Sequence, residues 1–329
     1  MSEVIRGVID KSTAQAICDA VKEKEGSTEG VPFNTVADRI RALSVGGGEN
    51  KLAQLVGGTL TEVTAEDLEG VTSIKQYAFY RQTQLKKITF SDSVTTIGTY
   101  AFSGCDNLEE IVLGNGITNI ENEAFFVNKS NRKVYVPSLE AWCAIRFYDQ
   151  DSSPLYSSYA PSYNPLLYIK NELGNYELLP ENLIIPNTVK EIKSYTFYYR
   201  TRLNSVIIPD SVTQLLGSNA FGGCSNLTSV VIGNGVKTIN SYCFDNCVKL
   251  TNLIIGTGVK DINGYAIRCG SADNKVTITF LGTTPPSIQT STFYTANLEK
   301  IIVPKGCGEA YKTATNWANF ADYIEEAAE

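Results

Sequence analysis

The stretch Val94-Thr-Thr-Ile97-Gly-Thr-Tyr100-Ala101-Phe102 decides the fold, because close variants of it recur along the chain. It is preceded by Val71-Thr-Ser-Ile74-Lys-Gln-Tyr77-Ala78-Phe79 and followed by Ile117-Thr-Asn-Ile120-Glu-Asn-Glu-Ala124-Phe125, with a step of 23 residues each time. The pattern returns at Val189, Val212, Val236 and Val259, which makes seven copies. A repeat of this length indicates a solenoid, because a single coil can bury its apolar residues only against the neighbouring coils.

Each copy continues into a short segment of alternating apolar residues, such as Leu108-Glu-Glu-Ile111-Val-Leu113. Alternation with a period of two residues predicts a β-strand. Residues that favour tight turns follow the strand, as in Gly114-Asn115-Gly116 and Gly233-Asn234-Gly235. We therefore expect one short strand and one tight corner in every coil, with the strands parallel.

The aromatic residue of the repeat is expected to build the core. Its copies predict an internal spine that ends at Ile267: Phe79, Phe102, Phe125, Phe197, Phe221 and Phe244. Cys105, Cys224 and Cys247 share another repeat position and are predicted to be buried thiols.

The middle residue of each strand is expected to point outward from the sheet, because successive side chains of a strand alternate between its faces. This column contains Thr89, Val112, Tyr135, Ile207, Val231, Ile254, Thr279 and Ile302. An apolar stripe on an exposed face is typical of a partner-binding surface. The alternative is that branched residues occur there because they suit any pleated surface.

A tyrosine-rich insertion at 138–182 offers a second candidate surface. Six tyrosines lie within 29 residues of this segment, among Ser, Asp, Asn and Pro. Tyrosine combines a rigid flat ring with a hydroxyl, which suits the recognition of a sugar or a protein. Tyr156, Tyr159 and Tyr163 are the binding candidates in this loop.

The repeat resembles the BspA-like leucine-rich repeat family over about 71–304. The similarity extends to the insertion, through Leu139-Glu-Ala-Trp142-Cys143, and to a terminal segment containing Val303-Pro304-Lys305 and Trp317. The resemblance implies an α/β repeat, a leucine-rich-repeat solenoid with short parallel strands. It also implies that Trp142 and Tyr168 pack inward.

The two ends of the chain are expected to be separate modules. Helical spacing of apolar residues predicts a small N-terminal helical module over 1–45, with 46–70 as linker and N-terminal cap of the solenoid. Gly46-Gly47-Gly48 breaks the chain between them. At the other end, Ala310, Tyr311, Ala314, Trp317, Phe320 and Ile324 predict a C-terminal helical cap over 305–329.

The stretch 31–43 resembles a helical element of phage tail and minor structural proteins from Gram-positive gut bacteria, and 58–67 resembles the same lineage. The alternative for this stretch is a generic helical hairpin that caps the solenoid.

Composition excludes most kinds of enzyme. Histidine is absent, which removes every Ser-His, Cys-His and His-metal arrangement. No phosphate-binding loop and no Gly-x-Ser-x-Gly motif is present, and the cysteines are too dispersed along the repeats to surround zinc. We therefore expect no enzyme, no metal and no cofactor.

Charge and hydropathy limit the partners in the same way. The formal net charge is −7 and no basic cluster occurs, so nucleic acid is not an expected partner. The longest apolar run is Ala141-Trp-Cys-Ala-Ile145, far shorter than the roughly 20 residues that span a bilayer, so no membrane insertion is expected. Met1-Ser2-Glu3-Val4-Ile5-Arg6 also lacks the pattern of a secretory signal.

These observations favour a non-enzymatic, phage tail-associated virion protein. In this hypothesis residues 1–45 join other tail proteins in the host cytoplasm, and the solenoid presents a recognition surface to a bacterial surface protein or glycan. Binding would use Tyr156, Tyr159, Tyr163, Val112, Tyr135, Ile207, Val231 and Ile254. The alternatives are a bacterial cell-surface BspA-like adhesin and a cytoplasmic protein-binding scaffold. Self-association into a homo-oligomer stays open.

Overall fold

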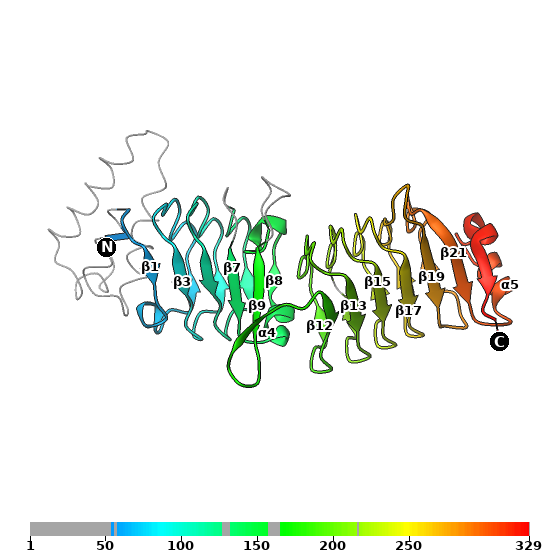
Figure 1. The fold of residues 1–329 in the computed structure, drawn as a ribbon, viewed down its shortest axis with the longest axis horizontal. Helices are drawn as coiled ribbons and strands as arrows, with labels where there is room; N and C mark the ends of the chain where they lie inside the picture. The colour runs from blue at the N-terminus through cyan, green and yellow to red at the C-terminus, as the bar shows by residue number, and fades with distance from the viewer. Residues whose placement is uncertain (1–53, 56–57, 127–131, 157–164, 216, 329) are drawn as a thin grey trace. The chain divides into compact units, whose positions relative to one another are not determined.

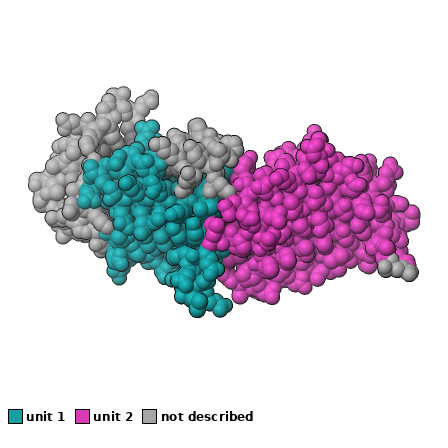
Figure 2. Space-filling model, in the orientation of Figure 1, with its two compact units in different colours: residues 1–137, 148–177 teal, residues 138–147, 178–329 magenta. Residues whose placement is uncertain are grey.

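The computed structural model describes residues 54–55, 58–126, 132–156, 165–215 and 217–328. The predicted helical module at 1–45 lies outside these residues. The chain forms two compact units (Figure 2). Unit 1 contains Met1–Pro137 and Tyr148–Glu177, and unit 2 contains Ser138–Phe147 and Leu178–Glu329. Each unit is a stack of coils built from short strands and turns (Figure 1).

Unit 1 is built on a sheet in which β1 to β9 pair in parallel, as the sequence predicts. Lys87 pairs with Glu110 and Glu110 with Lys133, so these two steps across the sheet are each one 23-residue repeat. The strand order is β1 (Glu62–Val63), β3 (Lys87–Thr89), β5 (Glu110–Val112), β7 (Lys133–Val136), β9 (Leu166–Lys170) and β10 (Tyr176–Leu178). A second set of two-residue strands pairs in the same way, with β2 (Ser73–Ile74), β4 (Thr96–Ile97) and β6 (Asn119–Ile120).

Unit 2 repeats this arrangement with a longer stack. Its main sheet contains β11 (Asn182–Ile184), β13 (Ser205–Ile208), β15 (Ser229–Ile232), β17 (Asn252–Ile255), β19 (Val276–Phe280), β21 (Leu298–Val303) and β22 (Ile324–Glu326). Its second sheet contains β12 (Glu191–Ile192), β14 (Gln214–Leu215), β16 (Thr238–Ile239), β18 (Asp261–Ile262) and β20 (Ser287–Ile288). Neighbouring strands of both sheets pair in parallel, so the predicted parallel-strand solenoid is confirmed.

The Tyr-Ala-Phe part of each coil is a turn that hydrogen bonds to the next coil. In the first repeat, the backbone N–H of Phe79 donates to the carbonyl of Ala101 and that of Arg81 to the carbonyl of Ser103. The tyrosine position has positive φ, 59° at Tyr77 and 55° at Tyr100. A left-handed residue lets the chain reverse within one turn, and the ladder of hydrogen bonds between coils offsets its conformational cost. The repeats therefore consist of strands and turns where the resemblance implied an α/β unit.

The phenylalanine spine is confirmed. All six of its rings are fully buried, and Ile267 continues the buried column. Phe79, Phe102 and Phe125 stack at centroid distances of 4.9 and 5.1 Å in unit 1. In unit 2, Phe221 lies 5.1 Å from Phe197 and 5.7 Å from Phe244.

The repeated cysteines form a second buried ladder. The thiol of Cys105 donates to the carbonyl oxygen of Phe79, and Cys224 and Cys247 make the same bond to Phe197 and Phe221. Each thiol thereby satisfies a turn carbonyl of the preceding coil. Burial raises the pKa of the Cys224 thiol to about 12 and raises that of Cys247 as well. The thiolate is therefore disfavoured at neutral pH.

Thiol labelling follows this burial. At pH 8, iodoacetamide is expected to modify Cys307, which is partly exposed, and to spare the six buried cysteines Cys105, Cys143, Cys224, Cys243, Cys247 and Cys269 until the protein is unfolded. Peptide mass spectrometry after labelling in buffer and in denaturant measures this difference. Rapid modification of Cys224 or Cys247 in buffer would contradict the ladder.

Part of the insertion belongs to unit 2. Ser138 caps helix α4 (Leu139–Ala144) by accepting a hydrogen bond from the N–H of Ala141, and β8 (Arg146–Phe147) follows. Trp142 is fully buried, as expected, and its Nε1 donates to the carbonyl of Thr196 at 2.9 Å. The part of the insertion from Tyr148 to Glu177 belongs to unit 1, with a 3-10 helix η3 (Gln150–Ser152) ahead of β9. A further 3-10 helix, η2 (Glu66–Leu68), precedes the first full repeat.

The C-terminal cap is only partly helical, so the predicted helical cap over 305–329 is not confirmed as a whole. Helix α5 (Gly308–Thr313) ends before Asn316, whose φ is 67°. A 3-10 helix η4 (Ala318–Tyr323) and strand β22 follow. Ile324 pairs with Ile301 of β21, so sheet hydrogen bonds take the place of the expected last helical turn. Tyr311 and Trp317 are fully buried against the end of the stack.

Glu326 ties this last strand to the start of α5. Its carboxylate accepts hydrogen bonds from the N–H groups of Gly306 and Gly308 at 2.9 and 2.8 Å, and these bonds lower its pKa. A lowered carboxylate pKa stabilises the folded state at any pH above the ordinary pKa of a glutamate. This stabilisation is lost as the pH falls through the lowered pKa of Glu326.

We therefore expect the amide of Ala327, which bonds to Val303, to exchange faster below about pH 4 than at pH 7 once intrinsic exchange rates are corrected for. Glu326→Gln should remove most of this pH dependence in hydrogen exchange. An unchanged pH profile in that variant would assign the effect to other groups.

Candidate binding surfaces

The outward face of the main sheet of unit 2 carries a row of aliphatic side chains. Ile184 pairs with Ile207, Ile207 with Val231 and Val231 with Ile254, so these four residues form one continuous row. The exposed fractions of Ile184 and Ile207 are 67% and 43%, and Val231 and Ile254 are half-buried. We call these four residues the aliphatic strip. Thr279 and Ile302 continue the row on β19 and β21.

A second row on the same face is polar but uncharged. It contains Asn182, Ser205, Ser229 and Asn252, which alternate with the buried strand residues. Ser205 donates to Asn182 at 2.8 Å, so part of the hydrogen-bonding capacity of this row is used between coils. No residue of β11, β13, β15 or β17 is charged. Depletion of charge around exposed aliphatic residues is typical of the centre of a protein interface.

The outward face of the unit 1 sheet has a different composition. Thr89, Val112 and Tyr135 lie in one row, as the spacing predicts, and Tyr168 is the next residue of that row. The rings of Tyr135 and Tyr168 stack at 4.9 Å. The expectation that Tyr168 packs inward is therefore wrong, because Leu167 occupies the buried position of β9.

A third ring completes this group. Tyr176 of β10 lies 5.1 Å from Tyr135, at an interplanar angle of 70°, and is 37% exposed. We call Tyr135, Tyr168 and Tyr176 the tyrosine cluster. Burial raises the pKa of the Tyr135 hydroxyl, and the nearby charge of Glu110 raises it further. Burial also raises the pKa of the Tyr176 hydroxyl. The hydroxyls of Tyr135 and Tyr176 therefore stay protonated at neutral pH and can donate hydrogen bonds.

Charged residues of both signs surround the tyrosine cluster. Lys87 lies 3.6 Å from Glu62 and 3.8 Å from Glu110, in a row that continues to Lys133. The ammonium of Lys170 lies 6.0 Å from the centroid of the Tyr176 ring. These exposed pairs contribute little stability, so their effect is to set the polarity of the surface.

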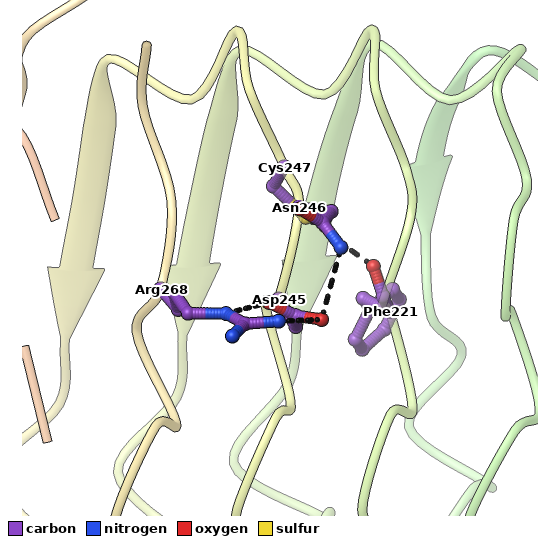
Figure 3. Close-up of polar contacts among 5 residues, drawn as sticks. All are labelled: Phe221, Asp245, Asn246, Cys247 and Arg268. Atoms are coloured by element: carbon purple, nitrogen blue, oxygen red, sulfur yellow. Dashed lines mark hydrogen bonds and ion pairs between the residues drawn. The ribbon is translucent and has the colours of Figure 1, made fainter. Parts of the chain in front are cut away.

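A polar cluster of Asp245, Asn246 and Arg268 on the turn side of unit 2 stabilises the stack of coils (Figure 3). The guanidinium of Arg268 binds the carboxylate of Asp245 one coil away, with 3.0 Å between Nη2 and Oδ2, and it lies over the ring of Tyr242. The hydrogen bond to Asp245 raises the pKa of Arg268. Asp245 also accepts a hydrogen bond from its neighbour Asn246. The ion pair between Arg268 and Asp245 joins two coils.

The tyrosines predicted in the insertion loop are only partly accounted for. Tyr156 is half-buried, and its carbonyl accepts a hydrogen bond from the buried guanidinium of Arg132 at 2.9 Å. Tyr159 and Tyr163 lie outside the described residues. Binding through these three residues therefore stays a prediction.

Sequence reasoning missed Ile184, Tyr168 and Tyr176 as surface residues. Ile184 has a clear sequence signal, since Asn182-Leu-Ile-Ile185 is identical to Asn252-Leu-Ile-Ile255. Tyr168 and Tyr176 lack such a signal, because a hairpin brings them together.

Within the described residues, no group of three His, Cys, Asp or Glu side chains could hold a metal ion. Among these same residues, no helix has both the length and the apolar composition needed to cross a membrane.

Residues 57–149 and 190–319 match the family described as BspA type leucine rich repeat region, in six copies. No curated protein matches the chain. Solved structures with a similar fold include a leucine rich cell surface protein from Faecalibacterium prausnitzii, at 21% identity and a TM-score of 0.41, with 82% of this chain and 83% of that chain covered. The pneumococcal vaccine antigen PcpA gives 16% identity and a TM-score of 0.43, with 82% and 78% covered. A leucine-rich repeat protein from Bacteroides ovatus gives 19% identity and a TM-score of 0.31, with 83% and 85% covered.

Proposed function

Since the chain belongs to the BspA-type leucine-rich repeat family, we propose that it is a non-enzymatic adhesin that binds a protein on a cell surface. The observation that carries this proposal is the aliphatic strip of unit 2. Its row of exposed branched side chains, set in an uncharged face, gives a partner apolar area with few polar groups to desolvate.

The apolar, uncharged character of the aliphatic strip indicates which kind of partner surface can bind it. Binding gains free energy only where the partner also presents apolar, uncharged surface, since a charge held against Ile184 and Ile207 would lose its hydration without a counter-charge. We therefore propose a protein with an exposed apolar patch.

The phage-tail role has less support than the adhesin role. It depends on the segment 31–43, which lies outside both the described residues and the family match, and on 58–67, which lies inside the match to the leucine-rich repeat family. Nothing in the comparisons points to a tail protein. The proposals that residues 1–45 join a larger assembly and that the protein resides in a virion remain untested.

A bead-adhesion experiment tests the proposed function. Beads that carry the full chain are incubated with epithelial monolayers and with Gram-positive bacteria, before and after the target cells are treated with trypsin. The triple variant Ile184→Thr, Ile207→Thr, Ile254→Thr keeps β-branched residues on the sheet and removes three exposed hydrocarbon groups. We expect it to reduce adhesion about tenfold, as loss of a central apolar contact does.

Leu281→Thr is the matched control, since Leu281 is an exposed aliphatic residue that lies outside the strip. It should adhere like the parent protein. Adhesion to neither cell type, or equal adhesion by the triple variant, would refute the proposal. Adhesion that survives trypsin would exclude a protein receptor.

A further inference from the structure

The tyrosine cluster of unit 1 presents its rings in more than one orientation. Elsewhere in the protein, tyrosines at equivalent repeat positions lie parallel, such as Tyr77 on Tyr100 at 3° and Tyr242 on Tyr265 at 1°. Tyr176 instead lies steeply across Tyr135 and stays 37% exposed. Part of an aromatic ring is therefore open to a ligand, next to the hydroxyls of its neighbours.

Hydrogen-bonding groups of both kinds lie beside these rings. Lys133 is two residues from Tyr135 on the same face of β7, and Lys170 lies over Tyr176, so two ammonium groups can donate. Glu110 lies close enough to Tyr135 to raise the pKa of the tyrosine hydroxyl, so a carboxylate can accept. Charges of both signs thus lie beside the rings, which favours an uncharged ligand over a strongly anionic or cationic one.

The hairpin that positions Tyr176 is held by its own side chains. Oδ1 of Asn171 accepts hydrogen bonds from the N–H groups of Leu173 and Asn175, at 3.0 and 2.9 Å. Nδ2 of Asn171 donates to Glu177 at 2.6 Å. A surface that is ordered before binding loses little conformational entropy when the ligand arrives.

We propose that the tyrosine cluster binds a neutral oligosaccharide. A pyranose ring has an apolar C–H face, which packs on an aromatic ring, and hydroxyls that both donate and accept hydrogen bonds. The aliphatic strip of unit 2 has neither aromatic rings nor charged groups, so the two surfaces suit different ligands. This saccharide site does not depend on the proposed protein contact.

Isothermal titration of the full chain tests the site. The neutral probes are cellotetraose, chitotetraose and lacto-N-neotetraose, and the anionic probes are 3′-sialyllactose and a heparin tetrasaccharide. At least one neutral probe should bind, and Tyr176→Ser should raise its Kd about tenfold or more. Lys170→Ala should raise it about threefold, because the ring contact remains. Tyr294→Ser, at an exposed tyrosine of unit 2, should leave the Kd within about twofold.

The outcomes separate the possibilities. Absence of binding by all three neutral probes at millimolar concentration overturns the proposal. So does binding that is unchanged in both Tyr176→Ser and the double variant Tyr135→Phe, Tyr168→Phe, which keeps the rings and removes two hydroxyls. Binding of the anionic probes alone, lost in Lys133→Ala, would replace the proposal with an anion site. Thermal melts of each variant check that it is folded, and the triple variant of the strip should bind the sugar normally.

Discussion

Phe221→Ala is expected to lower the free energy of unfolding of unit 2 by about 3–5 kcal/mol, as large aromatic truncations in cores do. The ring is fully buried between Phe197 and Phe244, so the cavity opens in the middle of the spine. The neighbouring rings are fixed by the turns that carry them and can close the space only in part. Urea unfolding followed by circular dichroism measures the loss.

Tyr294→Ala provides the control, because this ring is 55% exposed at the side of the stack. A surface substitution of this kind usually changes stability by about 0.5 kcal/mol or less. The backbone hydrogen bonds of Phe221 persist in the alanine variant, including the one its carbonyl accepts from Cys247, so the loss of stability reports packing. A difference between the two variants of less than about 1 kcal/mol would contradict the spine.

The repeat and its core could be predicted from the sequence because every coil must bury the same apolar side chains against its neighbours. Phe102 is buried for the same reason as Phe79 and Phe125, and seven copies make the period unmistakable. The row of outward residues followed from the same register, since alternation along a strand fixes which side chains point away from the core. Ile207, Val231 and Ile254 were identified on this basis.

Features that occur once in the chain were harder to predict. Ile324 and Glu325 lie in a helix-favouring sequence, but pairing with β21 places them in a strand, so tertiary contacts override local propensity. Tyr168 lies within the insertion at 138–182, and no repeat fixes the register of β9 against β7. The tyrosine cluster also needs the hairpin that brings Tyr176 back to Tyr135, a contact between residues that the repeat does not relate.

The assignment of residues 138–147 to unit 2 leads to the second large effect. Helix α4 is anchored there by Trp142 and by the carbonyl of Ala144, which accepts a hydrogen bond from Lys193 at 2.6 Å. Thr188 donates a further bond to Glu140. The segment thus covers the first coil of unit 2, where the apolar end of a repeat stack needs a cap.

Trp142→Ala is expected to destabilise unit 2 by about 3–5 kcal/mol, because it removes the largest buried side chain of this cap and leaves a cavity. Trp142→Phe keeps most of the packing and removes only the donor to Thr196, so about 1–3 kcal/mol should be lost. Hydrogen exchange resolves where the effect occurs: protection should fall in β12 and the Thr196 turn and persist in β3 and β5 of unit 1. Equal loss of protection in both units would mean that they unfold together, and no loss in β12 would show that α4 does not cap unit 2.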